Sequence, residues 1–432
     1  MAYKLPEQFI KNMQKQLPES EWEAFFATYE NKPYKGARLN PLKGTKEELR
    51  ALLPFLGESV PWEENGFYTD AEKLGANPFH AAGVFYSQEP SAMSVAPLLR
   101  VKAGERVLDL CSAPGGKGTQ MACQMQGEGC IVLNEPVESR AKILSQNVER
   151  LGIKNAVVTC ETPEKLAEKF EGYFDKILVD APCSGEGMFR KNAEEAFAEW
   201  SEENVALCAR RQKNILAAAT KMLKGGGLLA YSTCTFATAE DEEQVAAYLR
   251  EYPFMKLVKA EKLYPHKIKG EGHFLAVFSR EDTTDVRLVK ESKPFVSKAN
   301  ERIYADFEKG FFHTPFAKNL HEANGVLYAL PDNVFDWKGV QVLRVGLRLG
   351  EVKNGRFEPN HSLAMAARKA DCKRVVDLSQ TDGRVEKYLR GETIEADVEN
   401  GWCIVCVEGY PLGLGKAVNG VVKNHLPKGL RR

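Results

Sequence analysis

Two cysteines follow two different predicted strands and could carry covalent chemistry. Cys183 stands three residues after Asp180 in the sequence DAPCSG, and Cys234 stands in the sequence YSTCTF. Each thiol falls at a strand end in a polar segment, where side chains commonly face ligands. A thiolate there can bond to a substrate that a nearby carboxylate binds or protonates. A single cysteine is more often a core residue, but two at one edge favour covalent chemistry.

A third candidate is the glycine-rich sequence VLDLCSAPGGKGT at residues 107–119. It predicts a strand, a tight Pro-Gly-Gly turn and a helix. Gly115 and Gly116 let the backbone approach a ligand, and the helix start offers unpaired N–H groups. The loop is not GxGxxG and does not end in GK[ST], so a dinucleotide or a triphosphate is not favoured. Alone, it would equally fit a structural turn, so its interpretation depends on the segments downstream.

Those segments alternate strand and helix. Predicted strands end at Glu135, at Glu161 and at Asp180, and helices are predicted over 139–151 and 202–223. Steady alternation predicts a parallel sheet with helices on both faces, an α/β Rossmann-like fold. A carboxylate that ends the second strand of such a fold binds ribose hydroxyls, so Glu135 indicates an adenosine-type ligand.

The composition is that of a globular protein with several domains. The chain has 432 residues, with 59 Lys plus Arg and 59 Asp plus Glu, so local patches must hold any polyanion. At about 150 residues per domain, two to four domains are expected. The N-terminal region has no run typical of a signal peptide or membrane span, and we expect a cytoplasmic protein without membrane contact.

The ten cysteines do not form a disulfide pattern. Only Cys403 and Cys406 make a CxxC, in a predicted buried strand where they would point to opposite faces and could not chelate one ion. We therefore predict core cysteines here and no metal site.

The flanking regions have weaker patterns. Residues 5–30 predict an amphipathic helical cap, and residues 36–43 a short edge strand with Thr45 capping the helix after it. Residues 91–100 predict a helix, either a linking element or a lid over the ligand. Residues 281–300 are polar and charged, as in a linker, and strands are predicted at 325–330 and 340–349.

The motifs VLDLCSAPGGKGTQMA, NEP, DAPCSGEGMFRKN and YSTCTF together resemble those of the S-adenosylmethionine-dependent RNA cytosine-5 methyltransferases, the family that includes bacterial RsmB and RsmF and eukaryotic nucleolar proteins. The resemblance spans roughly residues 36–280 at motif level. Residues 401–431 are similar to the PUA-like end of the RsmF branch. The resemblance therefore implies an rRNA enzyme with a Rossmann-like methyltransferase core, an N-terminal cap and small β-rich C-terminal domains, one of them PUA-like.

The resemblance also implies catalytic roles. Cys234 matches the nucleophile that adds to carbon 6 of cytosine, which makes carbon 5 able to attack a methyl group. Asp180 matches the carboxylate that contacts the base near ring nitrogen 3, where a delivered proton relieves developing charge. Cys183 matches the cysteine that assists elimination of the adduct.

Binding residues follow from the same resemblance. The cofactor S-adenosylmethionine would lie against Cys111, Ser112, Ala113, Pro114, Gly115, Gly116, Lys117, Glu135, Arg140, Glu161 and Asp180. Glu161 stands where the family usually has Asp, and Lys117 could face either the base or the methionine carboxylate. RNA contacts are expected from Arg38, Asn40, Lys43, Arg190, Lys191, Lys416, Lys423 and Lys428.

The predicted division of the chain is a cap at 1–75, a catalytic domain at 76–282, a linker with a small β-rich module at 283–357 and a PUA-like domain at 358–432. We expect a monomer acting on 16S rRNA in the decoding region. The alternatives are a silent RNA-binding assembly factor, the same chemistry on tRNA, and a small-molecule or protein methyltransferase; paired cysteines disfavour the last, because O- and N-methylation need no thiol adduct.

Overall fold

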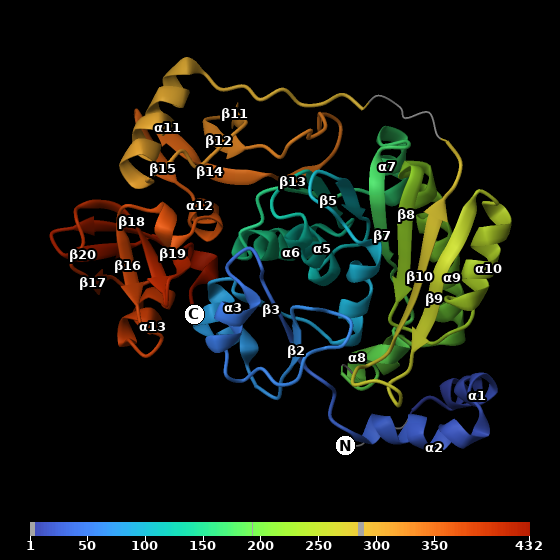
Figure 1. The fold of residues 1–432 in the computed structure, drawn as a ribbon. Coiled ribbons are helices and arrows are strands. Elements are labelled where there is room, and N and C mark those ends of the chain that lie inside the picture. The colour runs from blue at the N-terminus through green and yellow to red at the C-terminus, as the bar shows by residue number, and fades with distance from the viewer. Residues whose placement is uncertain (1–4, 192, 284–288) are drawn as a thin grey trace.

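An eight-stranded mixed sheet forms the centre of the computed structural model, which describes residues 5–191, 193–283 and 289–432 (Figure 1). Its strand order is β13-β6-β5-β4-β7-β8-β10-β9. The five parallel strands are β4 (Arg106–Asp109), β5 (Cys130–Asn134), β6 (Ala156–Thr159), β7 (Phe174–Asp180) and β8 (Leu223–Thr233). At the two edges, β10 (His273–Arg280) pairs antiparallel with β8, β9 (Met255–Leu263) pairs antiparallel with β10, and β13 (Val342–Val345) pairs antiparallel with β6. The predicted parallel α/β core is confirmed.

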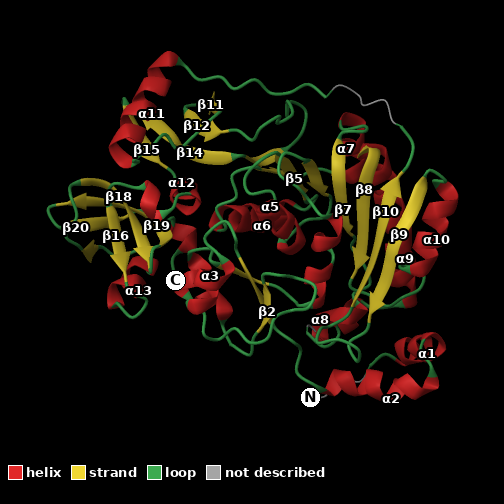
Figure 2. Ribbon diagram, in the orientation of Figure 1, coloured by secondary structure: helices red, strands yellow, loops and turns green. Residues whose placement is uncertain are grey.

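Helices cover both faces of this sheet (Figure 2). One face packs in a core cluster with α5 (Gly116–Gln124) and α6 (Glu138–Arg150). The other packs with α7 (Pro163–Lys169), α9 (Glu202–Met222) and α10 (Glu242–Glu251). The predicted helices at 139–151 and 202–223 agree with α6 and α9 to within a residue, because buried apolar positions recur at helical spacing along both.

The segment predicted as one strand over 340–349 is two strands that belong to different sheets. Gly346 separates them with a φ of 53°, a conformation that favours glycine. Before it, β13 pairs antiparallel with β6 of the central sheet; after it, β14 (Leu347–Lys353) pairs with β12 (Val326–Ala329). The β-rich module therefore supplies the outermost strand of the central sheet.

The N-terminal region forms a helical hairpin and a small sheet. Helices α1 (Glu7–Gln16) and α2 (Glu19–Ala27) agree with the predicted cap. The strands are β1 (Gly36–Leu39), β2 (Gly66–Tyr68) and β3 (Phe85–Ser87) in the order β2-β1-β3, so the predicted edge strand is in fact the central one.

Two helices follow in this region. Thr45 forms the expected capping box at α3 (Lys46–Ala51), and α4 (Pro78–Ala81) comes before β3. The helix predicted over 91–100 is instead two 3-10 turns, Ser91–Ser94 and Ala96–Leu99, the second with a proline in its first turn.

Two smaller sheets make up the C-terminal part. In the first, the order is β11-β12-β14-β15, with β11 (Leu320–Ala323), β15 (Arg356–Pro359) and helix α11 (Lys298–Phe311). The predicted boundary at 357 falls inside β15. Helix α12 (His361–Ala366) then packs on both β14 and β19 and so joins the two sheets. Of the predicted linker, residues 284–288 lie outside the described residues.

The second C-terminal sheet has the order β16-β18-β19-β20-β17. Its elements are β16 (Val375–Leu378), α13 (Gly383–Leu389), β17 (Ile394–Glu395), β18 (Gly401–Val407), β19 (Tyr410–Val418) and β20 (Val421–Asn424). As predicted, Cys403 and Cys406 lie on β18 and face opposite sides, since each belongs to a different core cluster. This sheet shares a core with β1 and β3, which places the C-terminal domain beside the N-terminal sheet (Figure 1).

No helix in the described ranges is long and apolar enough to cross a bilayer.

Candidate active site

Neighbouring parallel strands bring the two predicted catalytic cysteines together. In the pairing of β7 with β8, Asp180 lies opposite Ser232 at the carboxyl edge of the sheet. Cys183 follows Asp180 by three residues and Cys234 follows Ser232 by two, so both thiols lie just beyond the same edge. Their Sγ atoms are 3.1 Å apart. Adjacent strand ends therefore account for a thiol pair drawn from positions 51 residues apart in the chain.

The environments of the two thiols differ. The contact with Cys234 and burial together raise the pKa of the Cys183 thiol well above its ordinary value. The hydrogen bond of 3.3 Å that Cys183 Sγ accepts from the backbone N–H of Cys234 favours the thiolate and only partly offsets this rise in pKa. A thiol that stays protonated is a poor nucleophile but a possible hydrogen-bond or proton donor. The local chemistry thus separates the pair into a protonated member, Cys183, and its neighbour.

Asp180 stands beside the thiols in a polar network. Its Oδ2 lies 2.8 Å from Lys117 Nζ, and its Oδ1 accepts a hydrogen bond of 2.7 Å from the Ser232 hydroxyl. Burial alone would raise the pKa of this carboxyl, but the ammonium of Lys117 and the Ser232 hydrogen bond hold the pKa below its ordinary value. Asp180 is therefore ionised at neutral pH and is poised to accept hydrogen bonds. Lys117 is thus paired with the Asp180 carboxylate, and its contact with the base or with the methionine carboxylate stays a prediction.

His273 also belongs to this network and was not anticipated from the sequence. It is 2% exposed on β10, and its Nε2 lies 3.8 Å from Asp180 Oδ1. Burial, followed by the nearby charge of Lys117, lowers its pKa to about 3, so the imidazole is neutral. No local motif marks His273, because it reaches the site only through the antiparallel pairing of β10 with β8.

The glycine-rich loop turns tightly between β4 and α5. Gly115 has a φ of 113°, and a Cβ there would lie 2.9 Å from the Leu144 side chain. Ser112 holds the turn through a 2.8 Å bond to Asp109 Oδ2, and its backbone N–H donates to Asn134 O. A Cβ at Gly118 would lie 2.5 Å from the Ser112 hydroxyl, so the helix packs closely on the turn. The predicted loop is thus a rigid, compact element.

Acidic side chains end the next two strands. Glu135 is 2% exposed; its carboxylate accepts from the Val137 N–H and pairs with Arg140 at 3.3 Å. Arg140 also donates to Ala113 O at 3.0 Å, which ties Glu135 to the glycine-rich loop. Glu161 Oε1 accepts from Lys165 at 2.7 Å and from the Gln341 N–H at 2.8 Å. Gln341, the residue before β13, therefore holds the carboxylate of Glu161, which the family resemblance predicts to lie near the adenine.

This set of groups fits an adenosine cofactor that carries a carboxylate. Carboxylate oxygens at the ends of β5 and β6 suit ribose hydroxyls and an adenine amino group, which are hydrogen-bond donors. The start of α5, with no acidic residue in its first turn, suits a carboxylate. The glycine-rich loop allows its backbone to approach a ligand closely. The donor set is therefore consistent with S-adenosylmethionine.

Three residues predicted to contact RNA are instead used inside the protein. Arg38 is 3% exposed and donates to Gln88, to Gly116 O and to Thr119. Asn40 is 2% exposed and donates to Gly83 O and Leu151 O, while Lys43 Nζ donates to Met365 O. Since these donors have protein acceptors, we leave all three out of the proposed RNA surface.

Arg190 is also internal. Its guanidinium binds both carboxylate oxygens of Glu271, at 2.7 and 2.8 Å, and donates to Thr28 O and Gly270 O. It connects the segment after Cys183 to the N-terminal hairpin, which is a structural role. The other predicted RNA contacts, Lys191, Lys416, Lys423 and Lys428, are exposed.

Four protein-family models together match most of the chain. "N-terminal domain of 16S rRNA methyltransferase RsmF" matches residues 5–90, and "16S rRNA methyltransferase RsmB/F" matches residues 96–288. "RsmF rRNA methyltransferase first C-terminal domain" matches residues 306–366, and "Methyltransferase RsmF PUA domain" matches residues 373–432. The order of these models follows the order of the sheets, except that β13 of the central sheet lies within the match to the first C-terminal domain.

Relatives named ribosomal RNA small subunit methyltransferase F match over their full length. The Vibrio campbellii protein is 31% identical, covering 99% of this chain and 98% of the relative. The Aliivibrio salmonicida protein is 32% identical with the same coverage.

Solved structures share the core. A methyltransferase homologue from Pyrococcus horikoshii has a TM-score of 0.56 at 25% identity, covering 64% of this chain and 100% of that one. NSun6 from the same organism, solved with the S-adenosylmethionine analogue SFG, has a TM-score of 0.57 at 22% identity, covering 64% and 98%. At that identity the second likeness concerns the fold alone.

Proposed function

Because this chain belongs to the RsmF family of ribosomal RNA small subunit methyltransferases, we propose that it methylates carbon 5 of a cytosine in 16S rRNA through a covalent adduct with Cys234. The chain is an rRNA methyltransferase; the atom methylated and the adduct are the proposal. The observation that supports it is the pair of thiols 3.1 Å apart beside an ionised carboxylate. Methylation of an oxygen or an exocyclic nitrogen would need no such pair.

Cys234 begins the reaction. Carbon 5 of cytosine is a weak nucleophile, and addition of the Cys234 thiolate to carbon 6 converts the ring to an enamine whose carbon 5 can attack a methyl group. Of the two thiols, Cys234 suits this step because Cys183 is held protonated.

Asp180 orients the base. Its ionised carboxylate can accept a hydrogen bond from the amino group of cytosine, next to ring nitrogen 3. The lowered pKa of Asp180 means that it does not hold a proton in the free protein. Any proton delivered to ring nitrogen 3 must therefore be taken up after the base binds. Lys117, at 2.8 Å, stabilises the charge of Asp180 until then.

Cys183 serves product release. After methylation, the proton on carbon 5 passes to solvent water, the electrons of that C–H bond form the double bond between carbons 5 and 6, and the Cys234 sulfur leaves carbon 6 as a thiolate. The protonated Cys183 thiol lies against that sulfur and can donate a hydrogen bond to it as it departs. Without this assistance the protein would remain bonded to its RNA.

S-adenosylmethionine, when bound, supplies an electrophilic methyl group on a sulfonium. Residues 111–117 would hold its methionine end, Glu135 its ribose hydroxyls and Glu161 its adenine. Arg140 orients Glu135 by pairing with it, while Lys165 and the Gln341 N–H orient Glu161. These residues bind and position the cofactor; the bond-making groups belong to the thiol pair.

The proposed RNA surface consists of Lys191, in the segment that follows Cys183, and Lys416, Lys423 and Lys428 on the C-terminal domain. Exposed lysines of this kind bind phosphates without reading sequence. Full-length similarity to small-subunit enzymes favours rRNA over tRNA as substrate. With that substrate, we propose a cytoplasmic enzyme acting as a monomer on the decoding region.

Two cysteine variants test the mechanism. With labelled S-adenosylmethionine and small-subunit rRNA, Cys234→Ala should abolish methyl transfer. Cys183→Ala should still form the protein–RNA adduct and accumulate it as a complex that survives denaturing electrophoresis. Equal inactivity of both variants without adduct would refute the division of roles. Bisulfite sequencing of rRNA from a deletion strain identifies the cytosine, because its 5-methylcytosine signal disappears there. If no 5-methylcytosine signal disappears, the proposed chemistry is refuted.

A further inference from the structure

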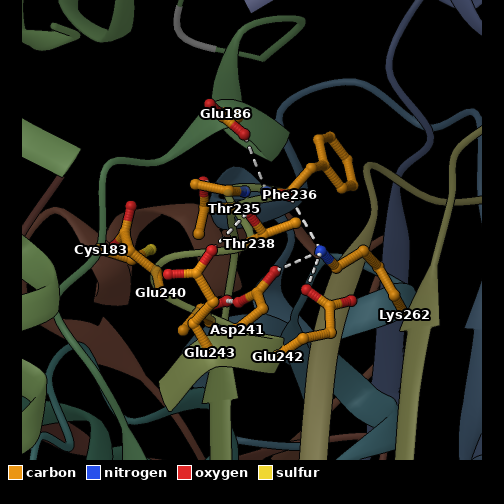
Figure 3. Close-up of polar contacts among 12 residues, drawn as sticks. Cys183, Glu186, Thr235, Phe236, Thr238, Glu240, Asp241, Glu242, Glu243 and Lys262 are labelled. Carbon is orange, nitrogen blue, oxygen red and sulfur yellow. Dashed lines mark hydrogen bonds and ion pairs between the residues drawn. The ribbon is translucent and has the colours of Figure 1, made fainter. Parts of the chain in front are cut away.

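Two buried carboxylates connect the segments that carry the cysteines. Glu186 lies three residues after Cys183, and Glu240 lies six residues after Cys234; they are 2% and 0% exposed. Each accepts a hydrogen bond from a backbone N–H of the opposite segment, Glu186 from Phe236 at 2.9 Å and Glu240 from Ser184 at 3.1 Å. Figure 3 shows both carboxylates around the Cys183 segment and the turn after Cys234. The two segments therefore brace each other reciprocally.

Glu240 acts on the peptide groups around Cys183. Its Oε2 accepts from the N–H of Ser184, the residue after Cys183, and from Gln212 Nε2 at 2.6 Å. The same Gln212 nitrogen donates to the carbonyl of Pro182, the residue before Cys183, at 3.0 Å. One Glu–Gln pair thus holds the backbone on both sides of Cys183. The backbone of Glu240 is itself fixed, because its carbonyl accepts from the Tyr231 hydroxyl at 2.6 Å.

Glu186 acts in the same way on Cys234. Its two oxygens accept from the Phe236 N–H and from Trp200 Nε1, at 2.9 and 3.0 Å. The neighbouring Gly187 N–H donates to the Cys234 carbonyl at 2.8 Å. The Cys183 segment thereby holds backbone groups both at Cys234 and two residues beyond it.

Buried carboxylates are a costly way to hold a loop. Burial raises the pKa of Glu186 and raises that of Glu240 to about 7, which reflects the free energy needed to keep a charge out of water. A carboxylate offers only acceptor sites, so it satisfies several N–H donors at once. If these acids only filled the core, their contacts would have no reason to converge on the backbone next to the thiols.

We propose that Glu240 and Glu186 are positioning residues, Glu240 placing Cys183 for product release and Glu186 placing Cys234 for adduct formation. This inference rests on the roles proposed above for the two cysteines. Neither glutamate contacts the reacting atoms, so each acts through the segment that it holds. Their loss should affect different steps of one reaction.

Glu240→Gln tests the proposed role of Glu240 in product release. If the amide carbonyl takes the place of Oε2, which accepts from both Ser184 and Gln212, the NH₂ takes the place of Oε1, 3.4 Å from the Ser184 nitrogen, and two donors then face each other. In the opposite orientation the NH₂ faces both donors, so the contact with the Ser184 N–H is weakened either way. We expect first-turnover methyl transfer within about threefold of wild type, steady-state turnover lower by roughly tenfold or more, and accumulation of adduct as for Cys183→Ala. Glu186→Gln should instead slow the first turnover by a similar factor and accumulate no adduct.

A matched control comes from the same turn. Glu243 is exposed, and its carboxylate accepts from Thr238 within its own segment, so Glu243→Gln should leave both steps unchanged. Adduct-free slowing in Glu240→Gln, or equal effects in Glu240→Gln and Glu243→Gln, would overturn the proposal.

An exchange variant separates positioning from general loss of structure. In Glu240→Gln/Gln212→Glu, the new amide carbonyl at position 240 can accept from the Ser184 N–H, and its NH₂ can donate to the new carboxylate at position 212, while the Pro182 carbonyl loses its donor. Charge is conserved, and release should recover part of its rate relative to Glu240→Gln alone. No recovery in a folded exchange variant contradicts the proposal, and this variant carries the test if Glu240→Gln does not fold.

Cys183→Ala, assayed in parallel, distinguishes the two proposals. If it accumulates adduct while Glu240→Gln behaves as wild type, the cysteine roles stand and the positioning role is wrong. If Cys183→Ala accumulates none, the cysteine roles fail, and the positioning roles that rest on them fail too.

Discussion

Lys117, in the first turn of α5, lies 2.8 Å from Asp180, the last residue of β7, so the loop that would hold the cofactor is joined by an ion pair to the carboxylate that would hold the base. The lysine side chain is 7% exposed and that of Asp180 is 33% exposed, so the pair is buried on the lysine side and open to solvent on the aspartate side. Binding of cofactor and orientation of the base therefore depend on one contact.

Replacement of Lys117 should change the pH dependence of methyl transfer. In Lys117→Met the carboxylate of Asp180 loses its cation, so the pKa of Asp180 rises. If the ionised form is the active one, the acid limb of the kcat/KM profile moves to higher pH, and the rate at neutral pH falls by roughly tenfold or more. Lys142→Met, which removes an exposed pair with Glu138, is the control. A gain of activity at high pH would show instead that Asp180 works as an acid.

The carboxyl of Asp109 should make the protein less stable as pH rises. Burial raises its pKa to about 7, above the unfolded value of about 3.9, so the folded state holds the extra proton between these values. The contribution of Asp109 is complete below about pH 4 and is lost as pH rises through 7, an upper limit of about 4 kcal/mol. Denaturant unfolding of Asp109→Asn and wild type, without cofactor, should therefore diverge in favour of Asn from pH 5 to pH 8. A constant difference would contradict this sign.

Arg190 should matter for stability and not for RNA affinity. Arg190→Met leaves Glu271 buried without its cation and should lower the free energy of unfolding by about 3 kcal/mol. The slope of log Kd for RNA against log salt should not change, because the guanidinium faces no phosphate. Lys191→Gln is the matched comparison, with unchanged stability and a slope reduced by about 0.9. If Arg190→Met instead lowers the salt slope and leaves stability unchanged, Arg190 belongs to the RNA surface.

The C-terminal lysines should contribute to RNA binding additively. Gln substitution at Lys416, Lys423 and Lys428 should each lower the salt slope by about 0.7 to 0.9 and weaken binding to rRNA without changing the first-turnover rate at saturating RNA. Lys353→Gln serves as the control, because Lys353 is paired with Glu351 on β14. Unchanged slopes for all three would place the RNA elsewhere.

The proximity of the Cys183 and Cys234 thiols could be predicted from the sequence, because it depends on where two predicted strands end. Strands followed by polar loops can be read locally, and adjacent parallel strands end at one edge. The opposite faces of Cys403 and Cys406 follow from the same alternation along a strand.

Other features could not be read locally. Arg38 and Asn40 look like surface residues, but acceptors on distant backbone segments, at Gly116 and Leu151, bury them. The split at Gly346 depends on a partner strand, β6, that lies far earlier in the chain. His273 joins the site through strand pairing alone. Tertiary contacts decided each of these, and a single sequence does not reveal which distant segments will meet.

The pairing of β13 with β6 also sets an order of events during synthesis. The parallel strands and the glycine-rich loop leave the ribosome long before Val345, yet until that residue emerges β6 is an open edge with unpaired backbone groups. Over that interval Glu161 lacks the Gln341 N–H that holds it. A nascent chain therefore fixes the carboxylate of Glu161, which is proposed to hold the adenine, only late in translation, and truncation after residue 283 should yield an aggregation-prone core rather than a minimal enzyme.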